Sequence, residues 1–376
     1  MTAKEYSILP LFKKFLKDSR KGKRLKTDGT KIKTQTINNY EYVLKYLQEY
    51  QTKYDTTLRI KIFSANNKRT FLAERNYWKK FYHEFTNYLY NKKNCFDNYV
   101  GAVIKVIRIF FNYVNKDLGI ATGDFYKSFF VCKEEVPIIT LLPEQLQFLI
   151  NDETFHQSLS PSLQKTKDIF VVGCTVALRV SDLFAIKFSD IEKRADAFYL
   201  PVKTIKTGAT VRIKLPDYAM VIVEKFKLTA KKRRTIFPPI PRTRFNDQLK
   251  AITELATWTG ETGKHRARRG LAVEGTFGSS KKKYRFCDLV SSHIMRCTAI
   301  TTMLMMGMKE HVVKQISGHS NDSKSFYRYV NLFLIQVNDK ILKKWQLFQE
   351  DCKYFISQTQ IFFAGERLIT ICQPIT

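Results

Sequence analysis

The sequence changes its pattern near residue 138, and this change limits the chain to a fold with two parts. Before it, apolar residues recur every three or four positions, which is typical of helices that bury one face. After it, helical patterns alternate with runs of β-branched residues at a period of two. Between them lies a polar, extended stretch with Glu134, Glu135 and Pro137. We therefore predict two domains, and a length of 376 residues is sufficient for both.

The first part is expected to be helical. One helix should begin near Thr36 and continue through INNYEYVLKYLQEYQ, and a second should cover NYWKKFYHEFTNYLYN. The aromatic residues of the second recur at intervals of three and four, which favours core packing over a base-stacking surface.

A third helix, NYVGAVIKVIRIFFNYV, is apolar nearly all round. Its polar exceptions Lys105, Arg108 and Asn112 are spaced so that they share one face. This face is either a solvated stripe on a packed helix or a surface that lies on DNA. In the second case, the two cations would meet phosphates or a guanine edge.

The second part mixes helices and strands. A helix should begin at Leu142-Pro143-Glu144, with Pro143 in its first turn. The segment AFYLPVKTIKTGATVRIKLP predicts a β-hairpin that turns at residues 206–208. The basic stretch GKHRARRGLAVEGTFGSSKKKYRF is expected to be a loop, and helices should resume after it. The predicted fold class is mainly α with a small β-sheet (α+β).

The charge balance points to a polyanionic partner. The chain has 64 Lys and Arg against 34 Asp and Glu, a formal net charge of +30. Residues 1–137 hold 27 cationic and 13 acidic residues, a net of +14, so both parts share the excess. Nucleic acid is the leading candidate, and an anionic membrane surface is the weaker one. Both parts should line one long anionic ligand.

The cysteines and the apolar runs argue against several other classes of protein. Seven Cys form no CxxC pair, which argues against a zinc site or a disulfide framework. The first residues lack the apolar core of a signal peptide, and the longest strongly apolar run, 169–178, is too short to span a bilayer. We expect a protein of the reducing cytoplasm with no membrane partner.

A set of residues near the C-terminus suggests phosphoryl chemistry. His293 and Arg296 form an H-x-x-R at helical spacing, His319 follows in ISGHS, and a Tyr-rich segment comes next. Guanidinium groups can hold the non-bridging oxygens of a phosphodiester, and a Tyr hydroxyl can attack phosphorus. A Lys can protonate the leaving oxygen, and a His can accept the Tyr proton. No carboxylates with metal-site spacing accompany these residues, so no metal or other cofactor is expected.

Four segments together resemble the signature boxes of tyrosine recombinases, in particular integrases of conjugative transposons and phages. They are ALRVSDL at 177–183, the hairpin KTGATVRIKL at 206–215, LVSSHIMR at 289–296 and ISGHS at 316–320. The resemblance covers roughly residues 10–345, and the boxes have the family's order and spacing.

The resemblance implies an architecture. Residues 1–137 would form a helical, SAM-like core-binding domain on DNA. Residues 138–345 would form the tyrosine-recombinase catalytic domain. Residues 346–376 would be a C-terminal tail, either exchanged between protomers or packed on its own domain.

The resemblance also implies catalytic roles by position. Arg179 and Arg296 would clamp the phosphate, and Asp182 would orient Arg179. Lys206, in the hairpin, would be the general acid. Lys203 is the alternative acid, but its earlier position in the strand favours a contact with the DNA backbone.

The remaining roles fall on two histidines and a tyrosine. His293 would be a general base or a phosphate donor, and His319 would support the phosphate and the nucleophile. Tyr329 would be the nucleophile, because SFYRY matches the family's S-F-x-x-Y ending. The family usually has nine positions from the second histidine to the tyrosine, whereas Tyr329 lies at ten and Tyr327 at eight. The S-F-x-x-Y frame favours Tyr329.

The implied activity is site-specific DNA recombination through a 3′-phosphotyrosine intermediate and a Holliday junction. The partners would be double-stranded DNA and three further copies in a tetramer, with accessory DNA-bending proteins as an open question. Two alternatives stay open at this point. One is a strand transferase of the type IB topoisomerase or telomere resolvase kind, and the other is a non-catalytic DNA-binding protein with the same fold.

Overall fold

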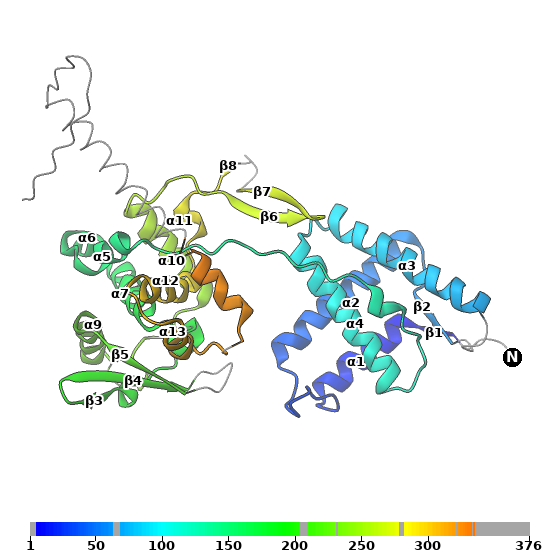
Figure 1. Ribbon diagram of the computed structural model, residues 1–376, viewed down its shortest axis with the longest axis horizontal. Helices are drawn as coiled ribbons and strands as arrows, with labels where there is room; N and C mark the ends of the chain where they lie inside the picture. The colour runs from blue at the N-terminus through cyan, green and yellow to red at the C-terminus, as the bar shows by residue number, and fades with distance from the viewer. Residues whose placement is uncertain are drawn as a thin grey trace, which may run out of the picture. The chain divides into compact units, whose positions relative to one another are not determined.

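The structure is a computed structural model that describes residues 5–62, 68–203, 210–230, 232–277, 282–320, 322–332 and 334. The chain divides into two compact units, drawn in Figure 1. The first contains residues 1–136 and 263–284, and the second contains residues 137–262 and 285–376. The break after Val136 lies next to the predicted boundary. The assignment of the units as core-binding and catalytic domains stays a prediction.

The first unit, called here the helical unit, is built around four long helices. They are α1 (Ile8–Arg20), α2 (Thr34–Tyr54), α3 (Lys68–Asn91) and α4 (Asp97–Lys116), followed by the short 3₁₀ helix η1 (Phe125–Ser128). Two short strands, β1 (Glu5–Ser7) and β2 (Arg59–Lys61), pair antiparallel beside them. The three helices predicted from periodicity are therefore confirmed as α2, α3 and α4.

The aromatic stripe of α3 forms much of the core of the helical unit. Trp78 contacts Phe81 and Phe111 edge to face, and Phe81 stacks on Phe85. Trp78, Phe81 and Phe85 are all at most 4% exposed. The prediction that this stripe packs in the core, and does not form a base-stacking surface, is confirmed.

The predicted loop after residue 263 is wrong, because this segment forms strands. Strand β6 (Lys264–Arg268) pairs antiparallel with β7 (Leu271–Phe277), which also pairs with β8 (Lys282–Lys283). Arg269 and Gly270 form the turn, and both have positive φ (56° and 78°), as in the type I′ turns that suit hairpins. The hairpin packs on α4 within the helical unit.

Two carboxylates of the helical unit hold this hairpin. Asp97 accepts hydrogen bonds from the backbone N–H groups of Arg269 (2.7 Å) and Gly270 (2.8 Å). Glu134 accepts one from Arg266 Nε (2.7 Å) and one from the backbone N–H of Ala267. A hairpin with almost no apolar side chains in β6 is thus stabilised by polar groups distant in sequence.

The second unit, called here the C-terminal unit, is mainly helical with one small sheet. Its helices are α5 (Pro143–Asn151), α6 (Glu153–Ser158), α7 (Pro161–Val176), α8 (Val180–Leu183), α9 (Asp217–Leu228), α10 (Arg242–Leu255), α11 (Phe286–Leu289), α12 (Ser292–Met305) and α13 (Glu310–Ser317). The 3₁₀ helices η2 (Phe188–Asp190) and η3 (Lys324–Phe326) join them. The sheet has the antiparallel order β3 (Glu192–Arg194), β4 (Ala197–Lys203), β5 (Thr210–Leu215).

Helices α7 and α12 lie side by side at the centre of the C-terminal unit (Figure 1). A Cβ atom at Gly173 would collide with the sulfur of Met295, so a larger residue there would force the Met295 side chain to move. The approach matters for function because Arg179 follows the end of α7 and Arg296 lies on α12. The crossing therefore brings two distant sequence boxes together.

These elements confirm several predictions and leave one untested. The fold class, mainly α with small β-sheets, is confirmed, and the hairpin predicted at 197–215 is β4–β5. The proposed tail at 346–376 lies outside the described residues. Within the described part of the chain, no helix is both long and apolar enough to cross a membrane.

Candidate active site

The candidate site begins where α7 ends. Ala177 caps this helix in a left-handed conformation (φ 55°), which leaves its carbonyl turned away from the helix. Arg296 Nη1 donates a hydrogen bond to that carbonyl at 2.9 Å. Arg296 is only 4% exposed. Burial and the nearby Arg179 lower the pKa of Arg296, although a guanidinium remains charged. A buried cation therefore lies at the junction of α7 and α12.

Arg179 lies two residues after this cap, at the N-cap of α8. Its Nη1 atom is 3.8 Å from Oδ2 of Asp182, whose side chain is buried one turn later in α8. Among the described residues, Arg179 Nη1 has no hydrogen-bond partner. The predicted pair of Arg179 and Asp182 is thus in contact, and a donor of Arg179 is left for a further acceptor.

His319 contacts Arg296 from the loop after α13. Ser317 Oγ lies 2.7 Å from His319 Nδ1, and the same hydroxyl donates to the Val313 carbonyl at 2.6 Å. Arg296 Nη2 lies 3.3 Å from both ring nitrogens of His319. Since the Ser317 proton is used in the bond to the Val313 carbonyl, we assign the ring proton to Nδ1, which leaves Nε2 as the acceptor toward Arg296. Burial and the arginines lower the pKa of His319 to about 4, so the ring is neutral at pH 7.

Tyr329 is buried against the same residues. It is 6% exposed, and its ring lies 5.8 Å from those of His319 and Phe326. Its hydroxyl lies close enough to Cys297 and Arg296 for each group to shift the pKa of the other. Burial and the Cys297 thiol raise the pKa of Tyr329 to about 12, whereas Arg296 opposes the rise. The hydroxyl needs a base before it can act as a nucleophile at neutral pH.

Tyr327, the other candidate nucleophile, lies in a different environment. It is 52% exposed, and Lys314 Nζ lies 5.0 Å from the centre of its ring. Among the described residues, its ring contacts neither Arg296 nor His319. The ring of Tyr329, by contrast, contacts that of His319, and its hydroxyl interacts electrostatically with Arg296.

His293 lies one helical turn before Arg296 on α12. Its residue surface is exposed, but partial desolvation by the surrounding residues and the positive charges of Arg296, Arg242 and Arg328 lower its pKa. A neutral imidazole can accept a proton, which is the property that a general base requires. His293 therefore lies close enough to these three arginines, one of which is Arg296, to be affected by their charge.

The remaining predicted residues lie elsewhere or cannot be placed. Lys206 lies outside the described residues, and only the backbone of Lys203, at the end of β4, is described. In the helical unit, Lys105 is exposed and Arg108 is half-buried on α4. Lys105 lines a pocket of about 500 Å³ between α2 and α4, near the exposed Tyr42 and Tyr99.

Sequence reasoning missed several residues of the candidate site. Ser317 orients His319 and was visible within the ISGHS box, two residues before the histidine. Cys297 directly follows Arg296, but nothing in the sequence indicated that it would contact Tyr329. Arg242 begins α10, and its effect on His293 depends on a tertiary contact.

The arrangement has the chemistry of an anion site with an internal nucleophile. Arg179 and Arg296 offer guanidinium donors, the neutral His293 and His319 offer ring nitrogens, and Tyr329 offers a hydroxyl. In the described part of the chain, no group of three or more His, Cys, Asp or Glu side chains could hold a metal ion. Such a site suits a phosphodiester and an attacking phenol.

We compared the chain with families of known proteins and with solved structures. The model described as "Phage integrase family" matches residues 147–334, half of the chain. This segment contains every residue of the candidate active site. No curated protein matches the chain.

Three solved structures with a similar fold are distant from this chain in sequence. A lambda integrase dimer bound to a COC′ core site has a TM-score of 0.56 and 15% identity over 86% of this chain and 77% of that one. XerH recombinase bound to a palindromic difH substrate has a TM-score of 0.55 and 13% identity over 89% and 84%. The Tn1549 transposon integrase with transposon right end DNA has a TM-score of 0.54 and 14% identity over 87% and 94%.

Proposed function

The chain belongs to the phage integrase family, and on that premise we propose that it is a site-specific DNA recombinase with Tyr329 as its nucleophile. The observation that carries the proposal is the buried cluster of Arg296, His319 and Tyr329, with Arg179 beside it. The partner is double-stranded DNA, as the charge of +30 suggests.

The reaction is a transfer of one phosphodiester bond to Tyr329. Its hydroxyl oxygen attacks phosphorus, the bond to the 5′ oxygen breaks, and a 3′-phosphotyrosine and a free 5′-hydroxyl result. Arg179 and Arg296 hold the non-bridging oxygens and stabilise the charge of the transition state. Arg296 is available because its hydrogen-bond partners among the described residues are the Ala177 carbonyl and the His319 imidazole, with no carboxylate. Arg179 is available because its Nη1 lies 3.8 Å from Asp182 and has no hydrogen-bond partner among these residues.

Two proton transfers complete the step. The Tyr329 proton passes to His293, whose lowered pKa keeps it neutral and able to accept. The leaving 5′ oxygen takes a proton from Lys206, which the resemblance assigns as the general acid. His319 donates no proton in this scheme; its Nε2 and Ser317 keep Arg296 oriented.

Strand exchange follows by reversal. The 5′-hydroxyl of a partner strand attacks the phosphotyrosine and releases Tyr329. Two such rounds exchange both strand pairs through a Holliday junction, in a tetramer. Asp182 supports Arg179, and Lys105, Arg108 and Lys203 contact the DNA.

A suicide-substrate experiment tests the proposal. Nicked duplexes from the DNA that flanks the reading frame would trap the covalent adduct, since a short cleaved strand diffuses away. We expect the wild-type chain and Tyr327→Phe to form the adduct and Tyr329→Phe to form none. Mass spectrometry of the digested adduct should place the nucleotide on the peptide with Tyr329.

Three outcomes would count against the proposal. An adduct in Tyr329→Phe that disappears in Tyr327→Phe would move the nucleophile. Specific binding of the duplex with no adduct in any form of the protein would indicate a non-catalytic DNA-binding protein. Relaxation of supercoiled DNA without exchange between two labelled duplexes would indicate a topoisomerase.

A further inference from the structure

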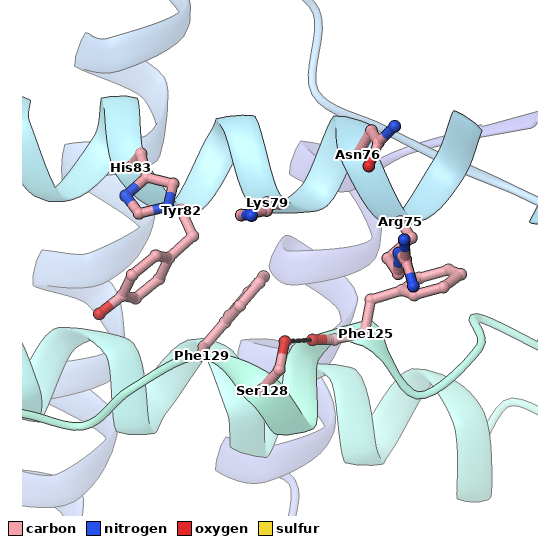
Figure 2. A pocket seen from close by; sticks show the side chains of 8 residues that line it. All are labelled: Arg75, Asn76, Lys79, Tyr82, His83, Phe125, Ser128 and Phe129. Carbon is pink, nitrogen blue, oxygen red and sulfur yellow. Dashed lines mark hydrogen bonds between the residues drawn. The ribbon is translucent and has the colours of Figure 1, made fainter. Parts of the chain in front are cut away.

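The helical unit contains a second candidate binding site, a pocket between α3 and η1 (Figure 2). Its volume is about 570 Å³, within the range of pockets that bind ligands or large side chains. Five lining residues come from α3 and three from η1 and the residue after it: Arg75, Asn76, Lys79, Tyr82, His83, Phe125, Ser128 and Phe129. None of these residues belongs to the candidate active site.

The rim of this pocket is cationic. Arg75, Lys79 and His83 recur every fourth residue, so they share one face of α3. Figure 2 shows these three side chains along α3, with Phe125, Ser128 and Phe129 across the pocket from the helix. No lining residue is acidic, and the structure gives Arg75 and Lys79 no ion pair within the described residues.

The acidic residues of α3 are neutralised by other partners. Glu74 is buried and pairs with Arg59 at 2.8 Å, and Glu84 pairs with Lys80 at 3.7 Å. Just before η1, the exposed Asp124 pairs with Lys127 at 2.8 Å. The positive charge of the rim is therefore left for a ligand from outside.

The floor of the pocket is aromatic, but it offers little open ring surface. Phe125 and Phe129 are 7% and 3% exposed, and Tyr82 stacks on Phe129 with ring centres 5.4 Å apart. Rings that are buried by their own neighbours cannot stack on a nucleobase, which needs an open face. The floor is therefore suited to contact with a bulky apolar group that enters the pocket from the solvent, and not to stacking on a nucleobase.

Exposed apolar side chains flank the pocket at both ends. Phe71 and Leu72, at the start of α3, are 39% and 44% exposed, and the ring of Phe71 contacts Phe125. Phe130 is 68% exposed at the other end, where its carbonyl accepts a hydrogen bond from Tyr82. Aromatic residues and arginine together are typical of protein interfaces.

From these features we propose that the pocket between α3 and η1 binds an acidic segment of another protein that inserts one bulky apolar side chain. Acidic side chains would pair with Arg75 and Lys79, while the apolar side chain would fill the space above Phe125 and Phe129. Duplex DNA is disfavoured, because its phosphate backbone has no bulky apolar group to fill the concavity. A second copy of this chain is disfavoured because its net charge of +30 would be repelled by the cationic rim. The proposal does not depend on the activity of Tyr329.

The test uses the full chain and a synthetic probe. The probe is a fluorescein-labelled 14-residue peptide of Asp, Glu and Gly with one central Trp, and its binding is followed by anisotropy. A peptide with Ser in place of Trp measures the contribution of the apolar group. A 14-nucleotide oligothymidine and a short duplex measure binding to nucleic acid.

Two variants and one control locate the binding. Arg75→Glu with Lys79→Glu should raise the Kd of the Trp peptide at least about tenfold, as expected for two lost charge pairs. Ser128→Trp should fill the pocket and reduce binding to the level of the Ser peptide. Lys13→Glu with Lys17→Glu makes the same charge change on exposed, four-spaced lysines of α1 and should change the Kd by less than about twofold.

Other results would overturn the proposal. If the α1 control variant lost as much affinity for the Trp peptide, binding would depend on net charge alone. If the Trp and Ser peptides bound equally well, the apolar side chain would not occupy the pocket. Oligothymidine or duplex binding that depends more strongly on Arg75 and Lys79 would make this a nucleic-acid surface. Unchanged helical circular dichroism would show that each variant is folded.

Discussion

Arginine is used in two different ways in the two units. On the hairpin of the helical unit, Arg266 Nε lies 2.7 Å from the buried Glu134, so its charge is matched within the fold. In the C-terminal unit, Arg296 is more deeply buried, yet the described residues give it a carbonyl and an imidazole. Burying a cation without a carboxylate is unfavourable for folding. The comparison suggests that Arg266 serves the structure and that Arg296 awaits an anion.

The largest expected effect separates these two arginines directly. Arg296→Ala removes a guanidinium that we propose contacts the transition state, so the single-turnover rate of covalent adduct formation should fall by about 10²–10³-fold. Arg266→Ala removes the same group from the hairpin and should change that rate less than about threefold. Comparable losses of rate in both variants would break the distinction between the two arginines. Because Arg296 also holds the Ala177 carbonyl, Arg296→Lys and the thermal midpoint of each variant are needed as checks.

The second prediction concerns the carboxylate that holds the hairpin turn. Asp97→Ala leaves two backbone N–H groups and the Tyr90 hydroxyl without their acceptor. The free energy of unfolding of the helical unit should fall by at least about 3 kcal/mol, since three hydrogen bonds are lost and each bond to a charged group contributes about 1.5–3 kcal/mol. Amide hydrogen exchange at Arg269 and Gly270 should accelerate accordingly. Asp124→Ala, which removes an exposed ion pair, should change stability by less than about 1 kcal/mol.

The same carboxylate predicts a pH dependence for the hairpin. Burial alone would raise the pKa of Asp97, but hydrogen bonds from Tyr90, Gly270 and Arg269 outweigh it and lower the pKa. Stabilisation by Asp97 is therefore present above its unfolded pKa and is lost as the pH falls through the lower folded value. Slow exchange at Gly270 that persisted in Asp97→Ala would show that the turn is held by something else.

The hairpin also shows where sequence-based prediction reached its limit. Strand β6 is KHRAR, with no apolar alternation to distinguish a strand from a basic loop. Its partners Glu134 and Asp97 lie more than 130 residues away, so only the folded chain reveals the contact. By contrast, β5 has apolar residues at the alternating positions Val211, Ile213 and Leu215, and that local pattern was sufficient to predict the hairpin.

The candidate active site was more predictable because each box is local. An H-x-x-R spacing places His293 and Arg296 on one side of a helix whatever the surroundings are. What could not be predicted is the environment of each group. The neutral state of His319, the burial of Tyr329 and the absence, among the described residues, of a carboxylate that pairs with Arg296 all depend on the α7–α12 crossing.

A third prediction uses the neutral state of His319. Its pKa is about 4 in the folded chain, below the ordinary value of 6.5. Between these values the unfolded chain binds the proton and the folded chain does not, so stability should fall as the pH falls from 6.5 toward 4. His319→Gln removes this titration, and its thermal midpoint should decrease less over the same range. Equal slopes for the two proteins would mean that His319 is not buried in its neutral form.

The smallest expected effect concerns Ser317, which orients His319 without touching the proposed substrate. Ser317→Ala removes the acceptor for Nδ1–H, so the ring can change tautomer and no longer accepts from Arg296 through Nε2. One hydrogen bond contributes about 0.5–1.5 kcal/mol, so the rate of adduct formation should fall by up to about tenfold. Ser325→Ala, which removes an exposed hydroxyl from the same segment of chain, is the matched control. A pH–rate profile distinguishes positioning from mere destabilisation, because only a change of tautomer should shift its acidic limb. An unchanged profile with a lower thermal midpoint would assign Ser317 to the core alone, and Arg296 would then be oriented by Ala177 without help from His319.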